Sequence, residues 1–218
     1  MGKTLVVAEK PDAARAMAKV LGCNIKKDGY IESDDYIVTW AVGHLVGLKD
    51  PEDYDEENKK WDLDALPFSY PIDHALKVLP KTAHQFAVIK KLIHRDDVDL
   101  LINGGDAGRE GLLIQEWIYR LCGNRKPKKI LWADSLAEST LKAAFANPKD
   151  YNQEFARLLD EAEARAEGDW TMGINYSRAI TLTKGGGRTL LVYGRCQTPL
   201  LEMIAKRDQE SANYKTEP

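Results

Sequence analysis

The stretch LINGGDAGREGLLI, residues 101–114, decides how the whole chain is interpreted. Apolar residues end in two glycines, and then Asp106, Gly108, Arg109 and Glu110 follow before the chain turns apolar again. The apolar runs on either side are typical of a buried strand and of a helix. The polar residues therefore fall in the connecting turn and in the first turn of the helix. Glycines in such a turn allow the backbone to approach its neighbours closely.

The segments around this stretch alternate between strands and helices. Short apolar runs predict buried strands over residues 4–8, 99–103 and 128–133, and a hairpin over residues 30–43. Helical spacing predicts helices over residues 11–22, 81–95, 110–123 and 135–146. The last of these helices is expected to open with a capping box of Ser135 and Glu138, whereas residues 47–71 have no period and predict a long surface loop. This alternation indicates an α/β fold, with a parallel sheet covered by helices on both faces.

The pattern changes near residue 150. Residues 151–181 and 197–210 have helical spacing, and KGGGR at residues 184–188 interrupts them. We therefore place a boundary at residues 148–155, with an α/β domain over residues 1–150 and a helical segment over residues 151–218.

The composition is that of an ordinary globular protein. A chain of 218 residues fits one large domain, or a medium domain with a smaller piece. The net charge of −3 gives no overall basic field, so affinity for nucleic acid has to come from local charge. Three cysteines without a CxxC pair argue against a structural zinc site. The chain has no run of eighteen apolar residues and no signal-peptide pattern, so we expect a cytoplasmic protein without a membrane partner.

Acidic residues follow two of the predicted strands. Residues 4–8 lead into Glu9, and residues 99–103 lead into Asp106 and Glu110. Parallel strands bind ligands at their carboxyl ends, so neighbouring strands would bring these carboxylates together. Mg²⁺ relieves repulsion within such a cluster, because it binds a few carboxylates together with water or phosphate oxygens. With the adjacent cations of Lys10 and Arg109, the residues indicate metal-assisted chemistry on phosphodiesters.

A purely structural interpretation of the same loop stays open. Acidic residues at a helix start often serve only as caps or as partners of the helix dipole. A dinucleotide loop is disfavoured, because the glycines at 105, 108 and 111 do not match G-x-G-x-x-G and no G-K-[ST] sequence follows.

Several collinear motifs resemble the type IA DNA topoisomerases, in particular their bacterial topoisomerase III group. VVAEKP (6–11) and GGDAGREG (104–111) resemble the two signature motifs of a Toprim domain. Other segments resemble the rest of that domain and the start of the next: YIVTWAVGHLVGLKDPEDY (36–54), ILWADSLAESTLKAAFANP (130–148), EARAEGDWTMGINYSRAITL (163–182) and YGRCQTPLLEMIAKRDQE (193–210). The resemblance implies a Rossmann-like Toprim domain over residues 1–150, followed by the incomplete start of a helical DNA-binding domain.

The chain departs from the family pattern at three positions. Gly108 stands where the acidic motif often has a second Asp, and Leu112 stands where Glu is usual. Cys196 replaces the usual Val, and we expect it to be buried.

The resemblance also implies a reaction. A Tyr outside this chain would attack a phosphodiester of single-stranded DNA, giving a 5′-phosphotyrosyl link and a 3′-hydroxyl. Glu9 is then the general acid for the departing 3′-oxygen, and Lys10 stabilises charge on the phosphate. Glu9, Asp106 and Glu110 are the expected Mg²⁺ ligands. Arg109 is either a phosphate contact or a salt-bridge partner that fixes the acids.

The helical segment carries the predicted DNA contacts. Arg165 and Asp169 are four residues apart on one helix face and are expected to pair where the single strand passes. Residues 171–201 contain four basic and no acidic residues, which favours a groove that follows phosphates over the alternative of a solvated basic face. The further candidate contacts are Arg178, Arg195, Gln197 and Thr198.

Three functions are therefore considered. The first is the N-terminal part of a type IA topoisomerase, with single-stranded DNA and the remaining domains of that enzyme as partners. The second is another Toprim phosphotransferase or nuclease, against which the segment GRCQTP (194–199) argues. The third is a nucleic-acid-binding module without catalysis.

Overall fold

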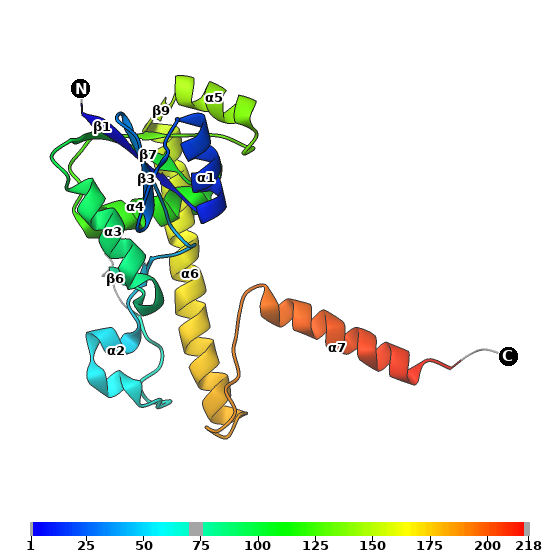
Figure 1. Cartoon of the computed structure of the whole chain (residues 1–218). Coiled ribbons are helices and arrows are strands. Elements are labelled where there is room, and N and C mark those ends of the chain that lie inside the picture. The colour runs from blue at the N-terminus through cyan, green and yellow to red at the C-terminus, as the bar shows by residue number, and fades with distance from the viewer. Residues whose placement is uncertain (1, 70–75, 216–218) are drawn as a thin grey trace. The chain divides into compact units, whose positions relative to one another are not determined.

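The computed structural model describes residues 2–69 and 76–215, which fall into two compact units. The first unit comprises residues 1–48 and 75–163, and the second comprises residues 49–74 and 164–218. The ribbon in Figure 1 identifies the elements of each. The division falls inside one long helix, α6 (Gln153–Thr183), beyond the boundary expected at residues 148–155, which stays a prediction.

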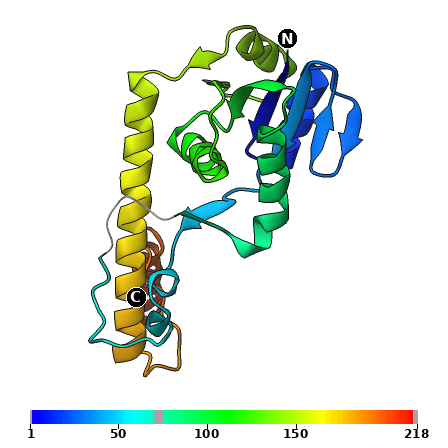
Figure 2. The ribbon, with the colours of Figure 1, turned by 90° about the vertical axis from the view of Figure 1, so that its left-hand side faces the viewer.

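A mainly parallel sheet forms the centre of the first unit. Its strand order is β2-β3-β4-β1-β7-β8-β9. The parallel strands are β1 (Lys3–Ala8), β4 (Tyr36–Trp40), β7 (Val98–Gly104) and β8 (Lys128–Ile130). The antiparallel strands are β2 (Ile25–Lys27), β3 (Tyr30–Glu32) and β9 (Lys149–Asp150). The β2–β3 hairpin forms one outer edge of the sheet (Figure 2).

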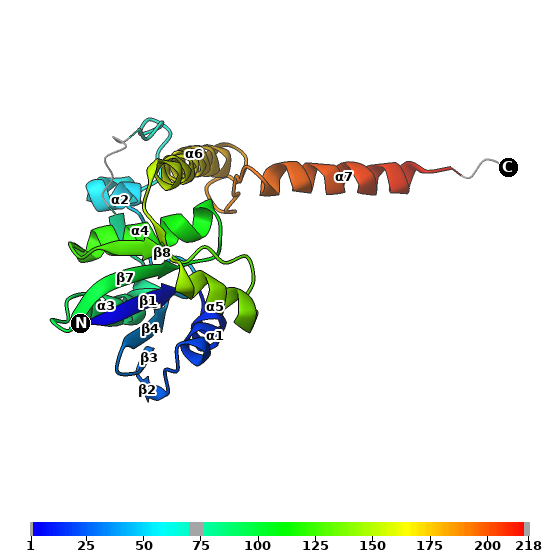
Figure 3. The ribbon, with the colours of Figure 1, turned by 90° about the horizontal axis from the view of Figure 1, so that it is seen from above.

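Helices cover both faces of this sheet, as the sequence predicts. On one face, α1 (Pro11–Val20) and α5 (Glu138–Ala146) bury Met17 and Leu141 against Val6 and Ile102 (Figure 3). On the other face, α3 (Ala83–Ile93) contacts α4 (Arg109–Cys122), and both contact the sheet. Because β1 lies between two strands and under two helical layers, its residues from Leu5 to Ala8 are fully buried.

The second unit gathers the C-terminal part of α6 with a segment distant in sequence. That segment contains the short helix α2 (Pro51–Tyr54) and a 3₁₀ turn (Glu56–Lys59). Asn175 of α6 accepts a hydrogen bond from the Phe68 amide (2.6 Å) and donates one to its carbonyl (2.9 Å). The last helix, α7 (Gln197–Asn213), follows the turn at residues 184–188 and buries none of its side chains.

Most of the predicted elements are confirmed, and three predictions are wrong. The expected loop over residues 47–71 contains α2 and the 3₁₀ turn, and it overlaps β5 (Val46–Leu48), which pairs with β6 (Leu76–Val78); residues 70 and 71 lie outside the described part. The strand predicted over residues 128–133 is β8, which ends at Ile130. The capping box is absent, since α5 begins at Glu138 and the Ser135 hydroxyl accepts from the Ala137 amide instead.

Within residues 2–69 and 76–215, no helix is both long enough and apolar enough to cross a membrane.

Candidate active site and nucleic-acid face

The carboxyl ends of β1 and β7 bring the two predicted acidic motifs together. These strands are parallel neighbours, and Ala8 pairs with Gly104. Glu9, the next residue after β1, is largely buried, and its Oε2 accepts a hydrogen bond from the Asp106 amide at 3.1 Å. The prediction that these strand ends meet is therefore confirmed.

The ammonium group of Lys10 lies between the two carboxylates. Its Nζ is 2.8 Å from Asp106 Oδ2 and 3.3 Å from Glu9 Oε1. Hydrogen bonds to Asp106 and then to Glu9 raise the pKa of Lys10 above its usual value. Lys10 therefore keeps its charge at neutral pH and offsets the repulsion between the two acids.

Glu110 and Arg109 have other partners. Glu110 Oε1 lies 2.8 Å from His44 Nε2, and the His44 ring lies beside Trp117 with 6.1 Å between ring centroids. His44 therefore serves as the side-chain partner of Glu110. Arg109 is expected either to contact a phosphate or to pair with the acids of the motifs. In the structure it forms an ion pair, but with Glu161 of α6, which lies outside these motifs.

The structure does not group three carboxylates as expected. Among the described residues, no set of three His, Cys, Asp or Glu side chains is placed to hold a metal ion. In this arrangement Glu110 is turned to His44 and not to Glu9 and Asp106, so the role of these three residues as metal ligands stays a prediction. Glu9 and Asp106 nevertheless share one cation, the Lys10 ammonium. The pair suits Mg²⁺, which needs only one or two carboxylates and keeps several waters or phosphate oxygens.

Two glycines make the close approach of the acidic loop to α4 possible. A Cβ atom on Gly111 would lie 2.7 Å from the Asp106 amide nitrogen and 3.0 Å from Glu9 Oε2. A Cβ atom on Gly105 would lie 2.5 Å from the Gly111 carbonyl oxygen. Any larger residue would push the loop away from the first turn of α4.

Asn103 is a site residue that the sequence analysis missed. It is 2% exposed near the end of β7, and its Oδ1 accepts a hydrogen bond from the Gly105 amide at 2.9 Å. Its Nδ2 donates to the Tyr151 hydroxyl at 3.3 Å. Burial raises the pKa of Tyr151, so the hydroxyl stays protonated. The signal in the sequence was a single amide at the end of an apolar strand.

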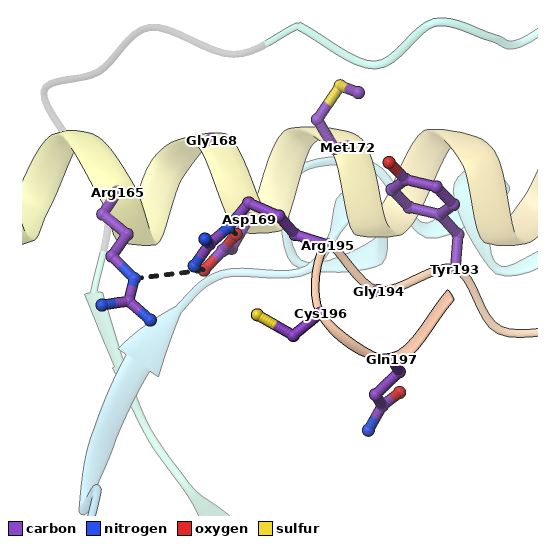
Figure 4. A pocket seen from close by; sticks show the side chains of 9 residues that line it. All are labelled: Arg165, Gly168, Asp169, Met172, Tyr193, Gly194, Arg195, Cys196 and Gln197. Carbon is purple, nitrogen blue, oxygen red and sulfur yellow. Dashed lines mark hydrogen bonds and ion pairs between the residues drawn. The ribbon is translucent and has the colours of Figure 1, made fainter. Parts of the chain in front are cut away.

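A cavity of about 660 Å³ lies in the second unit, between α6 and the turn before α7 (Figure 4). Asp169 is one of the residues that line it. Asp169 Oδ1 accepts from Arg195 Nε at 2.7 Å, and Oδ2 accepts from Arg195 Nη2 at 3.3 Å. Arg165 Nε lies 3.8 Å from Oδ2, which confirms the predicted pair. The hydrogen bond from Arg195 is the main cause of a lowered Asp169 pKa.

The turn before α7 contributes the other predicted contacts. Gln197 lines the cavity, and the Thr198 hydroxyl accepts from the Gly194 amide at 3.1 Å. Cys196 also lines the cavity and is exposed. The expectation that Cys196 is buried is therefore wrong, because it lies in this turn and not in a packed helix face.

Arg178 does not belong to this surface. It is 4% exposed, and it donates to the Asn58 carbonyl at 2.7 Å and to Glu52 Oε2 at 3.1 Å. Its guanidinium lies over the rings of Trp61 and Phe68, 5.1 and 4.9 Å from their centroids. The predicted DNA contact of Arg178 is therefore wrong, because the side chain is enclosed and holds the segment around residues 52–68 on α6.

Two protein families match successive parts of the chain. The Toprim domain family matches residues 4–133, more than half of the chain, and the DNA topoisomerase family matches residues 153–218. The chain belongs to the Toprim family. It is 46% identical over 218 residues to DNA topoisomerase 3 of Bacillus licheniformis, covering 100% of this chain and 29% of the relative. It is also 46% identical over 210 residues to DNA topoisomerase 3 of Bacillus subtilis, covering 96% of this chain and 28% of the relative.

The chain thus spans less than a third of these relatives. Topoisomerase I of Thermotoga maritima has the same fold, with a TM-score of 0.60 at 19% identity over 97% of this chain and 31% of that structure.

The Asn103 contacts predict a stability difference between two variants. Asn103→Leu leaves the Gly105 amide without its acceptor and removes the bond to Tyr151, so it should lower the free energy of unfolding by about 1–3 kcal/mol. Tyr151→Phe keeps the bond to the Gly105 amide, removes the bond from Asn103 together with the contact between the Tyr151 hydroxyl and Glu116, and should cost less. Urea unfolding measures both. An equal or larger decrease in Tyr151→Phe would contradict the role assigned to Asn103.

The Asp169 contacts predict a pH effect. Because the Asp169 pKa is lowered in the folded chain, the ion pair stabilises the fold above the unfolded pKa of about 3.9 and is lost as pH falls through the folded pKa. Arg195→Ala should move the Asp169 pKa upward, and Arg165→Ala should move it less, since Arg165 is farther away. Carboxyl NMR titration measures the shift. A larger shift in Arg165→Ala would overturn this ranking.

Proposed function

We propose that this chain supplies the Toprim part of a type IA DNA topoisomerase, which changes DNA topology by transient cleavage and religation of one strand. The nucleophilic Tyr would lie in a part of the enzyme outside these 218 residues. The observation that carries the proposal is the grouping of Glu9, Lys10 and Asp106 at the carboxyl ends of β1 and β7.

Glu9 is the proposed general acid. When the phosphodiester is attacked, the 3′-oxygen leaves with negative charge, and a carboxyl group beside it can supply the proton. In religation the same group takes the proton back from the 3′-hydroxyl. Its largely buried position and its hydrogen bond from the Asp106 amide would hold Glu9 at one place in the site.

Lys10 is the proposed electrostatic partner of the phosphate. Its Nζ is within 3.3 Å of both acids, but its side chain remains 57% exposed. A phosphate at the site would therefore find a charged donor that is already positioned. Arg109, bound to Glu161 and partly exposed, would serve as a second cation close to the loop.

Mg²⁺ is the proposed cofactor. Asp106 and Glu110 would hold it together with Glu9, and the bound ion would stabilise negative charge on the phosphate. Glu110 would have to exchange its contact with His44 for the ion, and Lys10 would compete with the ion for Asp106.

The proposed path of single-stranded DNA follows the cavity in the second unit. Arg165, Arg195, Gln197 and Thr198 would contact the strand, and Asp169 would orient the two arginines. Arg195 keeps about half of its side chain exposed while bound to Asp169, so it can also meet a phosphate.

The two alternatives have less support. A Toprim nuclease or phosphotransferase would not require residues 153–218 to match the DNA topoisomerase family. A binding module without catalysis would not require Glu9, Lys10 and Asp106 to meet at one strand edge. The remaining domains of the enzyme are the proposed partner, and a cytoplasmic location stays a prediction.

Glu9→Gln tests the general-acid role. The test uses a topoisomerase that contains this chain together with the further domains found in its relatives. In that enzyme the variant should cut single-stranded DNA at least about 100-fold more slowly, because an amide cannot donate a carboxyl proton. It should still bind the same oligonucleotide. Glu138→Gln, an exposed change on α5, serves as the control. Cleavage at the wild-type rate by Glu9→Gln would remove Glu9 from this role.

Arg195→Ala tests the DNA face in this chain. Fluorescence anisotropy of a labelled oligonucleotide at low salt with Mg²⁺ should give binding several-fold weaker than for the wild type, and less sensitive to salt. Arg207→Ala removes the same charge farther along α7 and should bind as the wild type does. Unchanged binding by Arg195→Ala would exclude this cavity as the entry face.

A further inference from the structure

A second cavity lies in the first unit, away from the acidic loop. It has a volume of about 580 Å³ and lies between the β2–β3 hairpin and α3. The hairpin supplies Lys27 and Tyr30, and α3 with the turn after it supplies Lys91, Leu92 and Arg95. In the order β2-β3-β4-β1, β2 is three strands from β1, which corresponds to about 14 Å. The size is within the range of small-ligand sites.

The walls of this cavity are fixed to one another. Gln85 of α3 donates to the Gly29 carbonyl at 3.1 Å and to the Trp40 carbonyl at 2.8 Å. Gly29 has φ +78°, and a Cβ atom there would lie 2.9 Å from Val88. The hairpin turn is therefore held against α3, and the residues that line the cavity keep their spacing.

The cationic groups of the cavity differ in how they are paired. Lys27 and Lys91 are exposed, and their side chains make no hydrogen bond or ion pair with any of the described residues. Arg95 is already bound to Asp97 at 2.7 Å and to Glu32 at 2.8 Å. The acidic residue at the rim, Asp28, lies 3.2 Å from His84. The two lysines are therefore the groups left to bind an anion.

An aromatic and apolar surface lies beside these lysines. Tyr30 is partly buried, Val88 lies against the turn, and Leu92 is 2% exposed. A phosphate alone would use only the cations. An acidic peptide would likewise leave the Tyr30 ring without a partner, whereas a nucleotide has a charged phosphate and a flat base that stacks on aromatic rings.

We propose that this cavity binds one nucleotide unit of single-stranded DNA, with its phosphate on Lys27 and Lys91 and its base on Tyr30. The choice of DNA rests on the proposed function. Lysines act as point charges without the planar fork of arginine, and stacking accepts any base, so the site is independent of sequence. A strand would thus be held at a second place, on the hairpin edge of the Toprim domain.

The chain offers a matched control for the lysines. Lys26 and Lys90 are their neighbours in sequence on β2 and α3, are exposed, and do not line the cavity. Anisotropy of a labelled oligothymidylate should give at least threefold weaker binding for Lys27→Ala/Lys91→Ala at low salt. The negative slope of log affinity against log salt should become shallower by roughly 0.7 for each phosphate that the variant no longer neutralises. Lys26→Ala/Lys90→Ala should stay within twofold of the wild type.

Tyr30→Leu separates a nucleotide from a bare anion. It should weaken oligonucleotide binding at least threefold with both lysines intact, while thermal unfolding monitors the fold of each variant. Equal weakening by both lysine pairs would overturn the proposal, because it would reflect net charge alone. Wild-type binding by Tyr30→Leu, together with displacement of the oligonucleotide by millimolar inorganic phosphate, would indicate a free-anion site and overturn it too. Loss of binding to a polyglutamate peptide, with oligonucleotide binding kept, would assign the lysines to an acidic peptide instead.

Arg195→Ala is measured beside these variants. If only Arg195→Ala weakens binding, the further site fails and the proposed DNA face stands. If only Lys27→Ala/Lys91→Ala and Tyr30→Leu weaken it, the proposed face fails and the further site stands.

Discussion

The parallel pairing of β1 with β7 is the constraint on which the rest of the site depends. The register places Ala8 opposite Gly104, so the next residues of both strands leave the sheet at the same edge. Glu9 then reaches the Asp106 amide, and Gly105 and Gly111 leave the space that this approach needs. The pairing itself is held by burial, since residues 5–8 are enclosed between two helical layers. A buried hydrophobic layer therefore fixes the position of a polar site.

Each charged side chain at this edge of the sheet is in contact with at least one polar or oppositely charged side chain. Lys10 serves Glu9 and Asp106 together, His44 contacts Glu110, and Glu161 pairs with Arg109. The contacts of Asp106, Glu110 and Arg109 are exposed, so each is weak and exchangeable, whereas Glu9 is largely buried. Such an arrangement suits a site where a bound phosphate and a divalent cation would replace these protein partners during the reaction. Asn103 is the opposite case, because its buried amide holds the loop by bonds that no ligand would replace.

The second unit contains arginines with two different roles. Arg178 is enclosed by the rings of Trp61 and Phe68 and by the Asn58 carbonyl, so it stabilises the unit. Arg195 is exposed and shares Asp169 with Arg165, so its charge is oriented but still available. The difference comes from the segment around residues 52–68, which contacts Asn175 and Arg178 of α6.

The sequence by itself determined the alternation of strands and helices, the two acidic motifs and the pairing of Arg165 with Asp169, because these depend on local periodicity and on spacing along one helix. It also identified the family, since several motifs occur in order along the chain. Only the tertiary structure decided which side chains meet. It turned Glu110 to His44, buried Arg178, exposed Cys196 and placed Lys27 and Lys91 at one cavity. These outcomes depend on contacts between residues far apart in the chain, and local patterns carry no information on which of two exposed partners a charged side chain will reach.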